Sequence, residues 1–192
     1  KTLQVLIAME SGRDPAAAVA EAFAASHPDR DITVIFTGPA RGRMGKVHNM
    51  ISALRAAKHP RVIFSDADIR TTPGLLRGTS AAFRSGYEAV FGLPYHAYVP
   101  DLGGWMFRVA FNYNFSVFAA LSHYLGLFHF AAGAWMAYTA DALSRAGGLE
   151  PVSRLVADDF AISQRVRRAG ARQHLLHEFA TVRETGTDAT EA

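Results

Sequence analysis

The sequence contains no cysteine and little charge of either sign. Without thiols, the chain cannot be a disulfide-stapled secreted scaffold, a zinc finger or an enzyme with a cysteine nucleophile. Only 19% of the residues are charged, and Lys plus Arg number 20 against 17 Asp plus Glu. The basic residues are scattered along the chain rather than gathered in a patch, so we expect no nucleic-acid partner.

Apolar side chains, by contrast, are abundant. They make up 49% of the 192 residues, and 13 of them are phenylalanine. A chain of this length and composition buries a core without disulfides or a structural metal, and it is too apolar to be disordered. We therefore expect residues 1–192 to form a single domain.

Short apolar runs alternate with helical segments along most of the chain. Runs rich in Val, Ile and Phe predict strands, and an N-cap residue followed by proline, at Asp14-Pro15 and Thr72-Pro73, predicts a helix start. Strands are expected at residues 3–9, 32–37, 61–66, 88–93, 134–139, 173–177 and 181–184, and helices at 15–26 and 158–170 and from residues 46 and 73 onward. This order predicts an α/β fold with a mostly parallel central sheet flanked by helices. Ligands bind such sheets beyond the carboxyl ends of the strands, so loops 10–14, 38–45 and 65–70 should line one cleft.

One long segment carries no charge at all. Residues 109–140 contain no Asp, Glu, Lys or Arg and are rich in Phe, Tyr and Ala. The segment is long enough for a transmembrane helix, but Asn, Ser and His residues and two glycines interrupt it. We therefore expect an insertion at about residues 103–133 that lies in a membrane interface or forms an aromatic wall over the cleft. Plain packing of a helical insertion into the core is the alternative.

Two acidic residues follow the third expected strand. Asp66 and Asp68 come directly after the apolar run at 61–65, where the chain turns. Mg²⁺ and Mn²⁺ take oxygen ligands and are commonly held by one or two carboxylates together with substrate phosphates. The tripeptide is therefore compatible with a metal and diphosphate site, and equally with a solvated acidic loop.

A second acidic pair, Asp158-Asp159, begins the last expected helix. Acids at this position are ordinary, because the first helical turn presents free N–H groups and the positive end of the dipole, so Asp158 is a candidate N-cap. Asp159 is alternatively a carboxylate that takes a proton from a substrate hydroxyl.

Taken together and in order, these motifs resemble a known enzyme family. They are GKVHN (45–49), FSDADI (64–69), GLPY (92–95), AGAW (132–135), AGGL (146–149) and ADDFAIS (157–163). The pattern is similar to inverting glycosyltransferases of the family 2/21 type, and within them to the ceramide glucosyltransferase group and the related hopanoid-associated bacterial enzymes. The resemblance covers most of the chain.

The resemblance implies a GT-A fold, the fold of transferases that use nucleotide-diphospho-sugars, with a UDP-sugar donor. It assigns Asp159 as the general base and Asp68 as the ligand of a divalent metal, Mg²⁺ or Mn²⁺, on the diphosphate. Asp66 belongs on the ribose or sugar side of the donor and beside the metal. Further donor-side positions are Lys46 and Asn49, with Glu10 or Asp14 near the uridine. The sugar and acceptor wall consists of Gly133, Ala134, Trp135 and Asp158.

An uncharged aromatic segment beside the catalytic helix suits a lipid acceptor whose hydroxyl lies at the membrane surface. We therefore expect a membrane-associated enzyme, with its catalytic domain on the cytoplasmic side, acting in glycolipid biosynthesis. Compared with the family pattern, an N-terminal βα unit, a Trp-containing motif after the base and flanking transmembrane helices are missing. The chain is thus expected to be a fragment of a larger enzyme, truncated at both ends and inactive alone.

Two other functions fit parts of the pattern. Phosphatases of the haloacid dehalogenase type also place Asp-x-Asp after an apolar strand, but the threonine they require four residues after the first Asp is replaced here by Arg70. A nucleotide-sugar-binding module without catalysis is the other alternative, and the presence of both Asp68 and Asp159 disfavours it.

Overall fold

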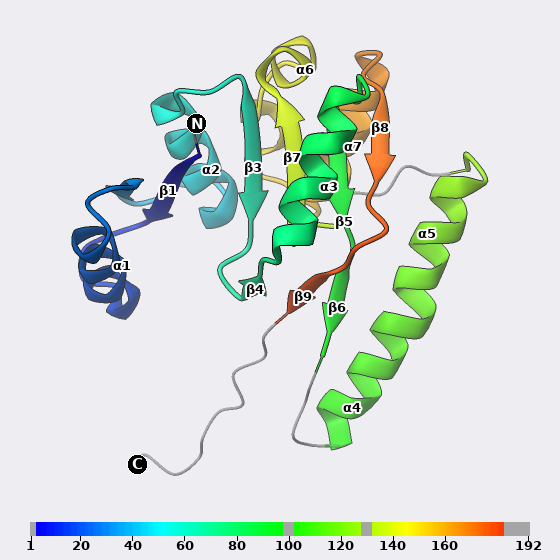
Figure 1. Ribbon diagram of the computed structural model, residues 1–192, viewed down its shortest axis with the longest axis horizontal. Helices are drawn as coiled ribbons and strands as arrows, with labels where there is room; N and C mark the ends of the chain where they lie inside the picture. Colours follow the sequence, from blue (N-terminus) through cyan, green and yellow to red (C-terminus); the bar gives the residue numbers. More distant parts are fainter. Residues whose placement is uncertain (1–2, 98–101, 128–131, 183–192) are drawn as a thin grey trace.

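The computed structural model describes residues 3–97, 102–127 and 132–182, which form sheets flanked by helices (Figure 1). In chain order the elements are β1 (Gln4–Met9), α1 (Pro15–Ser26), β2 (Asp31–Phe36), α2 (Gly45–Ala56), β3 (Arg61–Ser65), β4 (Ile69–Arg70), α3 (Pro73–Arg84), β5 (Ala89–Gly92), β6 (Pro94–His96), α4 (Leu102–Val109), the π-helix η1 (Ala110–Phe115), α5 (Ser116–Tyr124), β7 (Trp135–Thr139), α6 (Ala140–Arg145), the 3₁₀-helix η2 (Glu150–Val152), α7 (Asp158–Arg168), β8 (Gln173–Leu175) and β9 (Ala180–Val182).

The expected alternation of strands and helices is confirmed, and the helix starts follow from local chemistry. The Asp14 carboxylate accepts a hydrogen bond from the Ala16 N–H at 2.9 Å, and α1 begins at the next residue, Pro15. The Thr72 hydroxyl accepts from the Leu75 N–H at 3.1 Å before α3. In both cases a side chain satisfies an N–H that the helix leaves free, and proline supplies the helical φ.

The strands form three sheets, and β7 runs against its neighbours. β1 and β2 form a parallel pair, β4-β9-β6 a small sheet, and β3-β7-β5-β8 the central sheet. β7 pairs antiparallel with both β3 and β5, whereas β5 and β8 are parallel. The direction of β7 has a simple cause, because the chain leaves the sheet at the carboxyl end of β5 and returns at the same end. This return places residues 132–134 beside the carboxyl end of β3.

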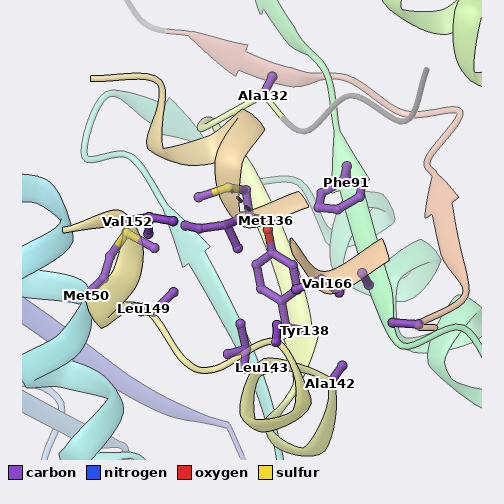
Figure 2. Close-up of a cluster of buried hydrophobic side chains, with 14 of the residues drawn as sticks. Met50, Phe91, Ala132, Met136, Tyr138, Ala142, Leu143, Leu149, Val152 and Val166 are labelled. Atoms are coloured by element: carbon purple, nitrogen blue, oxygen red, sulfur yellow. Dashed lines mark hydrogen bonds between the residues drawn. The ribbon is translucent and has the colours of Figure 1, made fainter. Parts of the chain in front are cut away.

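Two apolar clusters cover the two faces of the central sheet. Along β7, Met136 and Tyr138 belong to one cluster, whereas Trp135 and Ala137 belong to the other, which includes residues of α3. Figure 2 shows the first cluster around the Tyr138 ring. Tyr138 is fully buried, and its ring meets that of Phe91 edge to face with 5.8 Å between centroids. These layers hold β7 firmly in the sheet.

A cavity of about 1130 Å³ lies between β1 and β3. Its sides are the facing strands and α2, and most of the lining is apolar. The residues of β1 before Met9 and the middle of β3 are only half-buried, whereas β5 is buried throughout. At the end where β3 finishes, the cavity is lined by Lys46, Asn49, Ser65 and Asp66.

The first part of the uncharged segment, together with the residues just before it, folds as a continuous helical rod at the edge of the molecule (Figure 1). It comprises α4, η1 and α5, which we call the rod, residues 102–124. Residues 128–131 of the expected insertion lie outside the described residues. Within the described residues, no helix combines the length and apolar character needed to cross a membrane.

Candidate active site

The expected acidic residues meet where β3 ends and α2 and α7 begin. Lys46, in the first turn of α2, places its Nζ 2.6 Å from Oδ1 of Asp66, the residue that follows β3. Both side chains are a little over one third exposed, so this ion pair is open to solvent on one side. The Lys46 ammonium also donates to the Gly133 carbonyl at 3.5 Å. It therefore ties α2 and β3 to the segment that enters β7.

Gly133 is the point at which the two acidic motifs converge. A Cβ built on Gly133 would lie 3.5 Å from Oδ2 of Asp66, 3.5 Å from Oδ2 of Asp159 and 2.5 Å from Nζ of Lys46. Two carboxylates and an ammonium thus surround one backbone position. A side chain there would occupy the space between the carboxylates, so glycine keeps this space open.

Asp159 is held by two backbone donors. Its Oδ2 accepts from the Gly133 N–H at 2.9 Å, and its Oδ1 accepts from the Phe160 N–H at 2.7 Å. Charge-assisted bonds of this kind fix the carboxylate plane. Asp159 is therefore an oriented carboxylate, half-buried and facing Asp66 across Gly133.

Its neighbour Asp158 has a different environment. The side chain is only 9% exposed, and its Oδ2 has no hydrogen-bond partner among the described residues. Burial raises the pKa of Asp158, Lys46 partly offsets this rise, and the charge of Asp159 adds to it. Asp158 is not the N-cap of α7, because that position is Ala157 and Asp158 is the first residue of the helix. Backbone N–H groups of Asp158 and Asp159 also partly offset the rise in its pKa.

Replacing Asp158 with asparagine should therefore stabilise the protein at neutral pH. The raised pKa means that the charged carboxylate is less stable in the folded than in the unfolded state, where the pKa is near 3.8. Wild-type stability thus falls as pH rises above 3.8 through the folded-state pKa. We expect Asp158→Asn to raise the free energy of unfolding by about 1 kcal/mol at pH 7, and by less at about pH 4. Urea unfolding at both pH values tests this, and equal gains at both would contradict it.

Tyr138 lies beneath the acidic pair. Burial raises the pKa of Tyr138 far above its ordinary value, and the charges of Asp159 and Asp158 raise it further. The hydroxyl donates to the Met136 sulfur at 3.6 Å. Tyr138 thus remains a neutral, apolar floor that presents no competing charge to the site.

Asp68 lies in the turn between β3 and β4, and its side chain is exposed. Within the described part of the chain, no three His, Asp or Glu side chains come close enough together to hold a metal ion alone. Two aspartates at the end of one strand nevertheless fit a Mg²⁺ or Mn²⁺ ion that takes its other ligands from phosphate and water. Asp68 and Asp66 are the residues that would hold it.

The other donor-side positions lie around the same strand ends. Oδ1 of Asn49 accepts a 2.7 Å hydrogen bond from the Thr37 hydroxyl, which links α2 to the end of β2. The Glu10 carbonyl, just after β1, accepts from the Gly38 N–H at 3.0 Å. Asp14 stands further along, and its carboxylate is the cap of α1. In the sequence, Glu10 is therefore closer than Asp14 to Ala8, which lines the cavity.

The predicted wall is only partly at the site. Gly133 contacts the acidic residues, but Ala134 and Trp135 are 5% and 2% exposed and belong to the core cluster on the α3 side. The Trp135 Nε1 donates to the Thr79 hydroxyl at 3.0 Å inside that core. In this structure the Ala134 and Trp135 side chains anchor β7, Trp135 also lines the cavity, and Gly133 meets the carboxylates. The role of Ala134 and Trp135 in a substrate wall stays a prediction.

Two features of the site were not foreseen from the sequence. One is the Gly133 N–H bond to Asp159, which depends on the direction of β7. The other is the position of Tyr138 beneath Asp158 and Asp159. The alternation of side chains along the strand would have indicated the face on which Tyr138 lies, but the sequence does not show that α7 covers this face. Chemically, the site offers a cation for an anionic group, a pair of exposed metal-type ligands and an oriented carboxylate for proton transfer.

Comparisons with known proteins agree with this chemistry. The family described as Glycosyl transferase family 21 matches residues 1–191. Ceramide glucosyltransferase 1 of Caenorhabditis elegans is 26% identical over 179 residues, which are 89% of this chain and 37% of that protein. The chain thus spans just over a third of this relative's length.

A solved structure shares the fold. The crystal structure of glucosyl-3-phosphoglycerate synthase from Mycobacterium tuberculosis, in complex with phosphoglyceric acid, superposes with a TM-score of 0.52. The match covers 96% of this chain and 61% of that one, at 21% sequence identity. At this identity the likeness concerns the fold alone.

Proposed function

Because the chain belongs to glycosyl transferase family 21, we propose that it carries out inverting transfer of a sugar from a UDP-sugar to a lipid hydroxyl. Its fold is GT-A. Family membership also sets aside the haloacid dehalogenase phosphatase suggested by the Asp-x-Asp motif. The single observation that carries the proposal is that Asp66 and Asp159 face each other across Gly133.

The donor is expected beside Lys46 and Asp66. The Lys46 ammonium, a little over one third exposed, is positioned to offset negative charge on a diphosphate. A divalent cation held by Asp68 and Asp66 would supply further stabilisation of the departing diphosphate. The polar end of the cavity, with Asn49 and Ser65, leaves room for the rest of the nucleotide.

The acceptor hydroxyl is expected beside Asp159. The carboxylate takes the hydroxyl proton as the acceptor oxygen forms a bond to the anomeric carbon and the bond from that carbon to the diphosphate oxygen breaks. Attack from the side opposite the leaving group inverts the configuration, and UDP departs with the bonding electrons. The two backbone N–H bonds hold the base in place, so little reorganisation is needed at the moment of transfer.

We also propose that the acceptor is a membrane lipid of the ceramide or hopanoid type. The relative from Caenorhabditis elegans is named for ceramide, and the rod beside the core exposes an almost uncharged surface. The protein would then be membrane-associated, with this domain on the cytoplasmic side, where nucleotide sugars are made.

A donor and acceptor screen tests this function. The full-length protein is incubated with several UDP-sugars, Mn²⁺ and a membrane lipid extract, and the lipids are analysed by mass spectrometry. The expected result is a lipid heavier by one sugar with one of the donors. Binding of UDP-sugars with no glycolipid would favour a binding module.

A further inference from the structure

The rod has its polar residues on the inside. Seven polar or charged residues are buried in the described structure, and three of them, Asn112, Ser116 and Ser122, are on the rod. The Asn112 amide accepts from the His96 N–H at 3.1 Å and donates to the His96 carbonyl at 3.0 Å. The Ser116 hydroxyl donates to the Pro94 carbonyl at 3.4 Å. Hydrogen bonds thus fasten the rod to β6, and the small residues Ala119 and Ala120 pack its other end against the core.

The outer face of the rod is apolar. Residues 102–127 contain one charged side chain, Arg108, and no acid. The apolar side chains that are more than half exposed are Leu102, Trp105, Met106, Phe107, Tyr113, Val117, Phe118, Leu121, Tyr124, Leu125 and Leu127. A surface helix in water shows the opposite arrangement, with its apolar stripe turned inward.

The π-helical turns of η1 keep the two faces aligned. The inward positions 112 and 116, which are both buried, are four residues apart. In a regular α-helix such positions would drift by about 40° around the axis at each step. A π-helix has more residues per turn, so these positions stay on one side and the outer face stays continuous from α4 into α5.

We propose that the outer face of the rod lies in the interface of a lipid membrane, parallel to its surface, an inference that rests on the proposed function. A rod of residues 102–124 is about 35 Å long, and it presents Trp105, Tyr113 and Tyr124 at intervals along its length. Trp and Tyr prefer the headgroup level, where one end of the ring is wet. Arg108, with no acid near it in the rod, suits anionic headgroups.

A protein partner fits this face less well than lipid does. Protein interfaces carry about one hydrogen bond per 100–200 Å². The outer face offers few polar groups, because the side chains of Asn112, Ser116 and Ser122 are buried on the inner side. Those of Asn112 and Ser116 already bond to β6. Lipid acyl chains form no hydrogen bonds, so an apolar face can lie against them without polar partners.

This placement brings the membrane to the acceptor side of the site. The rod ends nine residues before Gly133 in the sequence. The Tyr124 hydroxyl also lies 3.2 Å from Nδ1 of His177, which ties the rod to the segment between β8 and β9. A lipid hydroxyl at the membrane surface would thus approach Asp159 from the side on which the rod lies.

Vesicle binding tests the proposal directly. Trp105 is 54% exposed and the other tryptophan, Trp135, is 2% exposed, so a change in fluorescence reports the rod. With phosphatidylcholine and phosphatidylglycerol vesicles, the emission should shift to the blue, and brominated lipids should quench it. Trp105→Phe should remove both effects. No shift and no quenching would overturn the proposal.

A matched pair of variants tests which face binds. Val117→Glu/Leu121→Glu places two charges on the outer face, and Val19→Glu/Phe23→Glu places them at the same spacing on α1, where the exposure is comparable. The first should weaken vesicle partitioning by at least about 10-fold and the second by less than about 2-fold. Circular dichroism checks that both fold.

Two further outcomes separate the alternatives. Equal partitioning of the two variants, or a dimer in sedimentation without vesicles that only the rod variant disrupts, would overturn the membrane assignment. Transfer to a short-chain, water-soluble acceptor should be unchanged in the rod variant. Absence of transfer in the wild type with such an acceptor would count against the proposed function and leave the vesicle result standing.

Discussion

Replacing Asp159 with asparagine is expected to lower the turnover of glycosyl transfer by about 10³-fold in the full-length protein. Asparagine has nearly the same shape and keeps an oxygen for the Gly133 N–H, but it cannot take a proton from the acceptor hydroxyl. The affinity for UDP should stay within about 2-fold, because the proposed donor contacts are Lys46, Asp66 and Asp68 rather than Asp159. Product formation by mass spectrometry and UDP binding by calorimetry measure the two effects.

A remote aspartate provides the control for this substitution. Asp141, in α6, has a side chain that is 71% exposed and pairs with Arg145 one turn later, so Asp141→Asn should leave transfer unchanged. Wild-type turnover in Asp159→Asn would show that another group accepts the proton. A parallel loss of UDP affinity would instead mean that the carboxylate supports the donor site.

Much of this site follows from local sequence pattern. Asp66 and Asp68 were placed after an apolar strand and Lys46 at the start of a helix, and the structure has them there. Such positions are readable because strand and helix boundaries depend on neighbouring residues. The Asp14-Pro15 and Thr72-Pro73 pairs predicted the starts of α1 and α3 for the same reason, and the structure confirms both.

The meeting of distant segments was not readable in this way. Gly133 reaches Asp66 because β7 enters the sheet antiparallel, at the end where β3 finishes. That direction is set by the path of the rod, and no local pattern encodes it. The surroundings of Trp135 were not readable from local pattern either, since aromatic residues suit a sugar wall and a core equally. Only the hydrogen bond to Thr79 shows that its indole is held in the core.

The sequence also did not show which side of the rod faces the protein. Composition reveals an uncharged segment, but it does not say which side faces the protein. The answer came from Asn112 and Ser116, whose partners are backbone groups of β6. A period-based prediction assumes that apolar residues turn inward. That assumption fails where the surroundings of the outer face are not water.

The second large effect is expected at Asp68. Asp68→Ala should weaken UDP binding in the presence of Mn²⁺ by about 10- to 100-fold, because it removes one of the two carboxylates that would hold the cation at the diphosphate. Without added metal, the weaker UDP affinity of the wild type and the variant should be equal. The variant should still fold normally, since Asp68 is exposed in the turn after β3. Calorimetry with UDP, with and without Mn²⁺, measures the difference.

A comparison with Lys46 separates the metal from simple charge. Lys46→Met removes the ammonium 2.6 Å from Asp66, so it should weaken UDP binding both with and without Mn²⁺. Asp68→Ala should weaken it only with the metal, because the Asp68 carboxylate would contribute to donor binding through the cation alone. Metal-dependent affinity that survives in Asp68→Ala would remove Asp68 from the metal site. Tighter UDP binding by the same variant without metal would show that Asp68 acts on the diphosphate by repulsion alone, which leaves Lys46 as the main source of donor affinity.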